Sequence, residues 1–251
     1  LAEKAGRLEE VGVSKDLARS ERIYSARFMG DRGYLVTFRQ VDPLYTMDLS
    51  NPYNPYVVGE LKIPGYSSYI HPVGKNHLLA MGMHIPAPGT GGWSDRALKL
   101  SIFDVSNFAS PKETLSYKIG SVYGRSEALS EHKAFNFYAQ RNLLAIPFSD
   151  WDYTKSGADY WKSFVSELKV FKVDVNNATI KEVGALSMAD MFEKKYGSNK
   201  YGYYYGYDWW VRRSVMATDQ QNNDYLYAIS DVGIRVSSLA APGKVLAEAK
   251  F

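Results

Sequence analysis

The chain contains no cysteine among its 251 residues. Disulfide bonds, thiolate metal sites and a cysteine nucleophile are therefore excluded. It also has no apolar run close to the roughly 18 residues that a membrane-spanning helix requires. No basic segment followed by an apolar one opens the chain as a signal peptide would. The sequence thus predicts no transmembrane segment in this chain.

A strong charge of either sign is missing as well. The formal net charge is +3 at pH 7, the isoelectric point is about 8.8, and the basic residues are spread along the sequence. Because nucleic-acid binding needs a basic patch or stripe, nucleic acid is not an expected partner. Histidine is scarce too, with four residues and no His-x-x-x-His pair, so a metal site made of imidazole groups is not favoured.

Aromatic side chains are abundant, with 20 Tyr, 11 Phe and 5 Trp. Large flat rings pack well on the pleated surface of a sheet. The composition therefore favours an all-β fold.

A repeated pattern divides the sequence. In three places a strand-like run ends in a tetrapeptide that begins with aspartate, and a second strand-like run follows. Aspartate favours a turn because its side chain can accept a hydrogen bond from the backbone two residues further on. The copies are Asp48-Leu49-Ser50-Asn51, Asp104-Val105-Ser106-Asn107 and Asp174-Val175-Asn176-Asn177, and a fourth, Val236-Ser237-Ser238-Leu239, has lost the acidic residue.

Two further strand-like runs precede each tetrapeptide, as in Ile23 to Gly30 with Tyr34 to Phe38, and in Lys133 to Tyr138 with Leu143 to Pro147. Four short strands per repeat, separated by turn residues, are typical of a β-propeller blade. We expect about four four-stranded blades that belong to a larger propeller, and hairpins in a β-sandwich are the alternative. The expected blades are residues 21–65, 66–120, 121–188 and 189–251.

The repeats are longer than the roughly 40 to 50 residues of common propeller repeats, which indicates insertions. One insertion is expected to begin with a short helix near Asp190 to Tyr196, because Ser187 and Asp190 stand at the spacing of a capping box. Insertions lie on propeller faces, where ligands are met. The three insertions are Ile85 to Gly92, Asp150 to Phe164 and Met188 to Trp210.

Residues 1–20 are expected to hold the outer strand of a preceding blade, at Gly6 to Val11, and a linker. Three inner partners of that strand are missing, and the chain starts at Leu1 rather than at a methionine. We therefore expect the missing blades to come from upstream sequence or from a neighbouring subunit.

Several strings within the repeats are specific enough to compare with a known family. They are Arg22 to Gly30, Val41 to Leu44, Gly59 to Gly65, Ser126 to Leu129 and His132 to Ala134. These strings resemble the archaeal and bacterial family of secreted proteins with a C-terminal β-propeller domain distantly related to WD-type repeats. The resemblance implies a propeller, secretion and an extracellular or cell-surface location, and it implies no catalytic residues.

A polar site near the propeller axis is one candidate for function. The repeats place Arg27, His71 and Glu127 where the innermost strands converge, and Arg213 joins them as the fourth candidate. Polar groups at such a place either bind a ligand or link neighbouring blades. The structural interpretation is favoured over the binding one.

A calcium site is a second candidate. Asp150, Asp152 and Asp159 lie in one insertion, and carboxylate oxygens are the ligands that Ca²⁺ takes. Their spacing matches no defined calcium loop. A solvated acidic loop is the favoured interpretation, and we expect no cofactor, with calcium as the possible exception.

A tyrosine-rich segment is the third candidate. Tyr203, Tyr204, Tyr205, Trp209 and Trp210 offer rigid faces for stacking against a protein or a glycan. Alternatively, these rings cover the side of a neighbouring blade.

The leading functional hypothesis is a secreted or cell-surface module for protein or glycan binding, or for extracellular assembly, without catalytic activity. The alternative is a hydrolase or lyase with its site at the propeller axis. Ser126, Glu127 and His132 are close in sequence, but no Gly-x-Ser-x-Gly elbow exposes a serine nucleophile. Fold alone cannot establish chemistry.

Replacing Tyr203, Tyr204 and Tyr205 by Ser is expected to weaken partner binding and to leave the melting temperature nearly unchanged. Exposed aromatic rings act in recognition rather than in core packing. Thermal unfolding followed by circular dichroism measures the second effect, and titration with the partner measures the first. A large loss of stability would show that the rings cover a blade.

Overall fold

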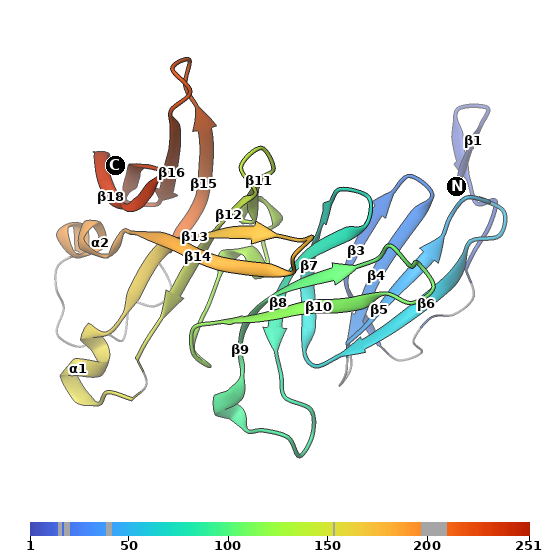
Figure 1. The fold of residues 1–251 in the computed structure, drawn as a ribbon, viewed down its shortest axis with the longest axis horizontal. Coiled ribbons are helices and arrows are strands. Elements are labelled where there is room, and N and C mark those ends of the chain that lie inside the picture. The colour runs from blue at the N-terminus through green and yellow to red at the C-terminus, as the bar shows by residue number, and fades with distance from the viewer. Residues whose placement is uncertain (15–16, 18–20, 39–41, 153, 197–209) are drawn as a thin grey trace. The chain divides into compact units, whose positions relative to one another are not determined.

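The computed structural model describes residues 1–14, 17, 21–38, 42–152, 154–196 and 210–251 (Figure 1). The chain divides into two compact units, Leu1–Lys118 and Ile119–Phe251, and each is described by itself.

The first unit holds a hairpin and two four-stranded sheets in which strands adjacent in sequence lie side by side (Figure 1). The hairpin is β1 (Ala2–Lys4) with β2 (Arg7–Glu9). The first sheet is β3 (Arg22–Met29), β4 (Arg32–Phe38), β5 (Asp42–Asp48) and β6 (Tyr56–Ile63). The second sheet is β7 (Tyr66–Val73), β8 (His77–His84), β9 (Ala97–Asp104) and β10 (Lys112–Ile119), with the 3-10 turn η1 (Trp93–Asp95) between β8 and β9.

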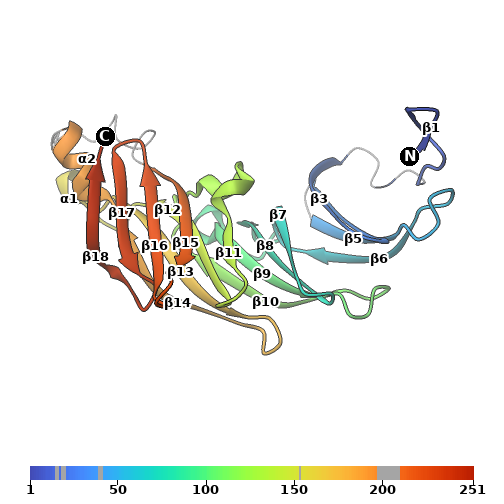
Figure 2. The same ribbon diagram turned by 90° about the horizontal axis from the view of Figure 1, so that it is seen from above.

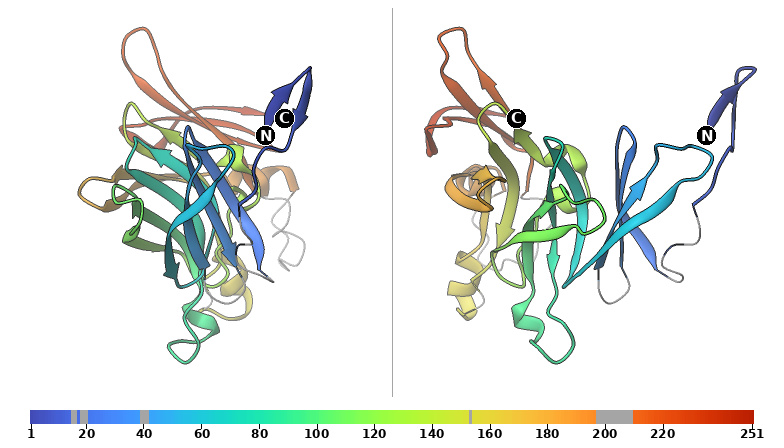
Figure 3. Two further views of the ribbon diagram at one scale, coloured as in Figure 1. Left: turned by 90° about the vertical axis from the view of Figure 1, so that its right-hand side faces the viewer. Right: turned by 45° about the vertical axis from the view of Figure 1, so that its right-hand side comes forward.

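The second unit holds two more four-stranded sheets of the same order (Figures 2 and 3). Two 3-10 turns, η2 (Glu127–Leu129) and η3 (His132–Ala134), precede the third sheet. That sheet is β11 (Asn136–Tyr138), β12 (Leu143–Asp150), β13 (Val165–Asp174) and β14 (Thr179–Ser187), with helix α1 (Gly157–Lys162) between β12 and β13. Helix α2 (Ala189–Tyr196) follows, and the fourth sheet is β15 (Val211–Thr218), β16 (Asp224–Ser230), β17 (Gly233–Ser238) and β18 (Ala241–Lys250).

The four four-stranded sheets confirm the predicted all-β fold with about four four-stranded blades. Among the described residues, no helix is long and apolar enough to cross a membrane.

The segment Gly6 to Val11, expected to be a lone outer strand, is instead part of a hairpin. Strand β2 pairs with β1 in the antiparallel register that sets Lys4 opposite Arg7. The two residues of the loop, Ala5 and Gly6, have φ angles of 51° and 75°, as a tight hairpin loop requires. One of the partners expected to be missing is therefore present as β1.

The core of the first unit lies between its two sheets. Side chains alternate between the two faces of a strand, so every second residue of one sheet meets the other. Ser25 adds a polar link, since its hydroxyl donates to the Ser67 carbonyl at 2.9 Å. The central residues of this core are at most 1% exposed, and they are Tyr34, Val36, Leu44, Leu78, Ala80 and Phe103.

The core of the second unit repeats this arrangement between the third and fourth sheets. The Asn136 amide donates to the Ser214 carbonyl at 3.0 Å, which links the two inner strands. Packing of this kind stabilises by about 25 cal/mol for each Å² of apolar surface removed from water. The fully buried residues include Ala145, Leu168, Val170, Leu226 and Ala228, each 0% exposed.

The aspartate turns form as predicted. Asp48 accepts a hydrogen bond from the Ser50 N–H at 2.8 Å, and Asp104 accepts one from the Ser106 N–H at 2.8 Å. Asp174 accepts one from the Asn176 N–H at 3.1 Å. Each carboxylate thus bonds the backbone two residues further on.

The fourth copy of this turn lies two residues later than the sequence alignment places it. The Leu239 N–H and the Leu49 N–H each donate to a carbonyl at the N-terminal end of the preceding strand, at 3.0 and 2.8 Å. Ser238 therefore occupies the position of Asp48, and its hydroxyl accepts the Ala240 N–H at 3.2 Å. A serine hydroxyl replaces the lost carboxylate.

The inner strand of the third sheet is shorter than the predicted Lys133 to Tyr138, because η3 takes the first part of that segment. The Glu131 carboxylate accepts the Lys133 N–H at 3.1 Å, and the Ser126 hydroxyl accepts the Ala128 N–H at 3.2 Å. Such local side-chain bonds compete with pairing in a sheet.

Helix α2 confirms the predicted short helix. The Ser187 hydroxyl accepts the Ala189 N–H at 3.3 Å, as an N-terminal cap does. Asp190 binds Arg235 of the fourth sheet at 2.7 Å. Helix α1, in the insertion of the third sheet, was not predicted.

Arg235 ties α2 to the fourth sheet. Its side chain is 7% exposed, and it donates to Asp190, to Glu248 at 3.0 Å and to the Ser187 carbonyl at 2.7 Å. Hydrogen bonds from Arg235 hold the pKa of the Asp190 carboxyl far below its ordinary value. A depressed pKa in the folded state contributes stability above the unfolded pKa of about 3.9, and this stability is lost as the pH falls below that value.

Replacing Asp190 by Asn is expected to lower the free energy of unfolding at neutral pH by about 1–2 kcal/mol, because a nearly buried guanidinium loses one charged partner. The variant's stability should also fall less steeply in acid than that of the parent protein. Denaturant titration at neutral pH and below about pH 4 measures both effects. Glu193→Gln, on the exposed side of the same helix, is the control and should change neither quantity.

Candidate functional site

Five charged side chains gather in the second unit, and we call them the Arg212 cluster: Arg212, Arg213, Glu127, Glu131 and Asp231. Arg212 donates to Glu127 at 3.3 Å and, through two nitrogens, to Asp231 at 2.9 and 3.0 Å. Arg213 lies 3.2 Å from Glu131 and 3.9 Å from Glu127. Glu127 is therefore shared by two guanidinium groups.

Local backbone features position these groups. Glu127 opens η2, where Ser126 fixes the turn by donating to the Pro147 carbonyl at 2.6 Å. The pairing of β15 with β16 shifts between Val211 and Arg213, so Arg212 is an extra residue in its strand. Because a bulge turns the chain locally and redirects a side chain, two consecutive arginines both reach the acids.

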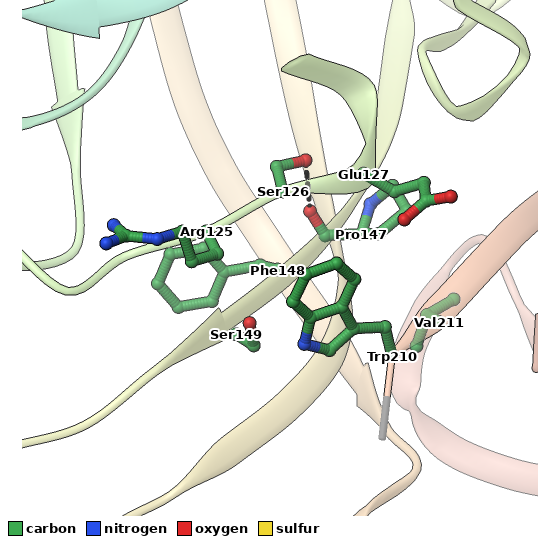
Figure 4. A pocket seen from close by; sticks show the side chains of 8 residues that line it. All are labelled: Arg125, Ser126, Glu127, Pro147, Phe148, Ser149, Trp210 and Val211. Carbon is green, nitrogen blue, oxygen red and sulfur yellow. Dashed lines mark hydrogen bonds between the residues drawn. The ribbon is translucent and has the colours of Figure 1, made fainter. Parts of the chain in front are cut away.

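Trp210 borders this cluster (Figure 4). Its ring centroid lies 5.7 Å from the Arg212 guanidinium carbon, within the range of a cation–π contact. The indole nitrogen is buried and has no hydrogen-bond partner among the described residues. Beside it is a cavity of about 10 Å³, large enough for one water molecule at most. The lining residues are Arg125, Ser126, Glu127, Pro147, Phe148, Ser149, Trp210 and Val211.

In the first unit, Arg27 and His71 are joined through Tyr69. Arg27 donates to the Ile70 carbonyl at 3.0 Å and to the Tyr69 hydroxyl at 2.9 Å, and that hydroxyl lies 3.4 Å from His71 Nδ1. Burial, and secondarily the Arg27 charge, lowers the pKa of His71 below its ordinary value. The imidazole is therefore neutral at pH 7. This group links the inner strands of the first and second sheets.

The four residues expected near the axis thus form two pairs, one in each unit: Arg27 with His71, and Glu127 with Arg213. The pairing shifts in β3 and β7 make Arg27 and His71 equivalent positions. In β15 the corresponding shift makes Val215 the residue equivalent to Arg27 and His71. Arg213, which the sequence suggested for this position, lies two residues earlier in the strand.

Sequence reasoning missed Arg212, Tyr69 and Asp231. The consecutive arginines were the available signal, since two long cations in one strand would point to opposite faces unless a bulge intervenes. Four residues of the tyrosine-rich candidate lie outside the described residues: Tyr203, Tyr204, Tyr205 and Trp209. The fifth residue, Trp210, is described and lies beside the Arg212 cluster.

The three aspartates of the calcium candidate have separate surroundings. Asp150 is 7% exposed and accepts the Ser121 N–H and hydroxyl, both at 2.6 Å, and the Trp151 N–H at 2.7 Å. Asp152 caps a turn by accepting the Thr154 N–H at 3.1 Å. Asp159 is exposed on α1. No three His, Cys, Asp or Glu side chains of the described residues come together as a metal site.

A comparison with protein families assigns the fold. The model of the Beta propeller domain family matches residues 2–241. The chain belongs to that family. The predicted propeller is therefore correct at the level of the family, and its sheets are propeller blades.

Two curated relatives of this propeller are archaeal. An uncharacterized protein of Archaeoglobus fulgidus is 42% identical over 153 residues, which are 61% of this chain and 23% of the relative. An uncharacterized protein of Methanocaldococcus jannaschii is 41% identical over 140 residues, 56% of this chain and 21% of the relative. The aligned part of the propeller thus covers less than a quarter of either relative.

A solved structure supports the fold alone. The Saccharomyces cerevisiae protein Sqt1 matches with a TM-score of 0.51 and 8% identity, over 97% of this chain and 52% of Sqt1. At this identity the likeness carries no information on ligands.

Replacing Asp150 by Asn is expected to lower the free energy of unfolding by about 1–3 kcal/mol, because an amide cannot accept all three of the short hydrogen bonds that the buried carboxylate accepts. Asp152→Asn, at a side chain 41% exposed, is the control and should cost no more than about 0.5 kcal/mol.

The Asp150→Asn variant also tests the calcium alternative. A chelator should leave the melting temperature of the parent propeller unchanged. If added calcium raised that temperature, and Asp150→Asn removed the effect, a calcium site would be shown, because a ligand bound only by the folded state stabilises it.

Proposed function

We propose that this propeller is a non-catalytic module of a secreted or cell-surface protein, and that it binds a protein partner through the Arg212 cluster and Trp210. The observation that carries the proposal is the grouping of an indole ring with charged side chains that remain accessible. Arg212 and Arg213 are 31% and 33% exposed, and Glu131 and Asp231 are 39% and 53% exposed.

The chemistry of the cluster suits recognition. Arginine and tryptophan are the residues most enriched where protein interfaces gain their affinity. Ion pairs at the surface contribute little to folding, typically 0–1 kcal/mol each. The charges of this network that remain accessible are available to an interacting partner. Their fixed geometry also lowers the entropy lost on binding.

The hydrolase or lyase alternative gains less support from the cluster. A general acid needs a carboxyl whose pKa is raised toward the working pH. The Lys133 N–H donates to Glu131, and with the nearby Arg213 it lowers the pKa of Glu131 below its ordinary value. The Glu131 carboxylate stays ionised at neutral pH, as an ion-pair partner requires.

A glycan is the second candidate partner, favoured by Trp93 in the connection between β8 and β9. This ring is 58% exposed, and the Arg96 guanidinium carbon lies 4.6 Å from its centroid. A rigid, exposed ring offers an apolar face on which a sugar can stack.

We propose that the protein is secreted and lies outside the cell or on its surface, because its sequence resembles secreted propeller proteins. Nucleic acid is not proposed as a partner, since the net charge is only +3. No cofactor is proposed.

Binding to cell-envelope proteins of Archaeoglobus fulgidus, the source of a relative with 42% identity, tests the proposal. Replacing Arg212 and Arg213 together by Ala is expected to weaken binding at least about tenfold, a loss of about 1.4 kcal/mol. Surface plasmon resonance with the fractionated envelope measures the effect, and a glycan panel tests the second candidate.

Arg141→Ala is the matched control. Arg141 is also an ion-paired and partly exposed arginine, 2.6 Å from Asp224 and 38% exposed. Its loss should leave envelope binding unchanged. Equal binding by the double variant and the parent propeller would contradict the role of the Arg212 cluster.

A further inference from the structure

The turn between β13 and β14 of the third blade carries a pattern, Asn-x-Ser/Thr, that occurs once in the chain. Asn177 is followed by Ala178 and then by Thr179. An asparagine with a hydroxyl residue two positions later, and no proline between them, is the acceptor motif of N-glycosylation. The two other aspartate turns have an asparagine at the same place without the hydroxyl residue, in Asn51-Pro52-Tyr53 and Asn107-Phe108-Ala109.

This turn extends further than the corresponding turns of the first two blades (Figure 2). In those blades the turn aspartate is opposite the first residue of the second strand, as Asp104 is opposite His77. In the third blade that first residue, Leu143, is opposite Lys172. The hairpin then continues to Asp174, which pairs with the start of β14. Its tip therefore lies two residues beyond the second strand of its own sheet.

The two defining side chains of the motif are accessible. Asn177 and Thr179 are both exposed, as an enzyme that modifies the asparagine requires. The equivalent Asn107 is also exposed, although its turn packs on the first blade, where the Phe108 carbonyl accepts the Thr46 hydroxyl at 2.6 Å. Packing of such a turn on a neighbouring blade thus leaves the asparagine position uncovered.

The Asn177 amide can take a sugar and keep its place in the turn. Its nitrogen Nδ2 donates to the Asp174 carboxylate at 2.8 Å. A primary amide carries two N–H groups, so one remains to donate when a sugar replaces the other. The backbone N–H groups of Asn176 and Asn177 also donate to Asp174, at 3.1 and 3.0 Å. The turn is therefore held mainly by bonds that the modification does not touch.

We propose that Asn177 carries an N-linked glycan when the chain is outside the cell. The donor is an oligosaccharide held on a lipid phosphate, and the transferase is a separate enzyme of the membrane. The bond from Asn177 Nδ2 to the sugar carbon C1 forms as the bond from C1 to the phosphate oxygen breaks. The amide gives up one proton, and the lipid phosphate leaves with the electron pair. The proposal rests on the proposed secretion, because this motif is an acceptor in secreted proteins.

A glycan at Asn177 leaves the Arg212 cluster free. The Asn177 turn lies beside the turn between β11 and β12, whose Asn142 carbonyl accepts an N–H of β13 at 2.9 Å. This end of the third blade meets the C-terminal end of β15, where the hydroxyls of Tyr138 and Thr218 lie 2.6 Å apart. Arg212 is at the opposite end of β15. The glycan and the proposed partner site therefore occupy opposite ends of these two blades.

Expression of the chain with an added export signal, in an archaeal host that N-glycosylates its surface proteins, tests the site. The added signal makes the test independent of the natural route of secretion. Trypsin cleaves after Lys172 and Lys181 and releases residues 173–181 as one peptide. Mass spectrometry should find this peptide with the mass of an oligosaccharide added, and fragmentation should place that mass on Asn177 rather than on Asn176. The chain without the export signal should give the unmodified peptide.

Four variants of the exported chain separate the motif from its surroundings. Asn177→Gln and Thr179→Ala should each abolish the added mass, because each removes one required side chain, whereas Thr179→Ser keeps the hydroxyl and should keep the glycan. Asn176→Gln is the matched control, since it lies in the same exposed turn and is not followed by a hydroxyl residue two positions later. It should leave the glycan in place. Circular dichroism confirms that each variant is folded.

An unmodified peptide from the exported parent chain, beside glycosylated surface proteins of the same host, would overturn the proposal. A glycan that persisted in Thr179→Ala would overturn it as well, since the acceptor motif would then not be the signal. The proposed function fails in a different measurement. Equal envelope binding by the Arg212 and Arg213 double variant and the parent would contradict that function and leave the mass of this peptide unchanged.

Discussion

Burial of apolar residues between neighbouring sheets is the interaction on which this structure depends. A four-stranded blade has two faces and cannot bury either one by itself, so a propeller repeat is stable only beside another repeat. Tyr34 and Leu44 are buried only because the second blade packs on the first, and Leu168 is buried by the fourth. Polar links such as Asn136 to Ser214 add direction to contacts that are mainly hydrophobic.

The sequence predicted the elements that local chemistry determines. Aspartate at positions 48, 104 and 174 marked turns because the carboxylate bonds a backbone N–H two residues on, and the number of blades followed from these three turns and the fourth copy that lacks the aspartate. Ser187 marked the start of α2 for a similar reason. The fold class was therefore predictable from one sequence.

Features set by pairing between strands were not predictable in the same way. The fourth turn uses Ser238, whose hydroxyl can replace a carboxylate, so a search for an acidic residue placed the turn two residues early. The inner strand of the third blade lost its first half to η3, which Glu131 stabilises. Arg212 was missed because its orientation depends on a bulge that the sequence does not display. In each case a tertiary or side-chain contact outweighed the local pattern.

The blades differ most where they are least constrained. The core positions remain apolar even where their volume differs, as Tyr34 and its equivalent Ala145 show, because each is buried beneath a neighbouring sheet. The equivalent inner-strand positions carry Arg27, His71 and Val215, which share no chemistry. Side chains on inner strands and in insertions can vary without loss of the fold, so they are where one propeller can acquire a specificity that another lacks. A ligand is therefore best sought at these positions, and in the Arg212 cluster several accessible charges lie beside an aromatic ring.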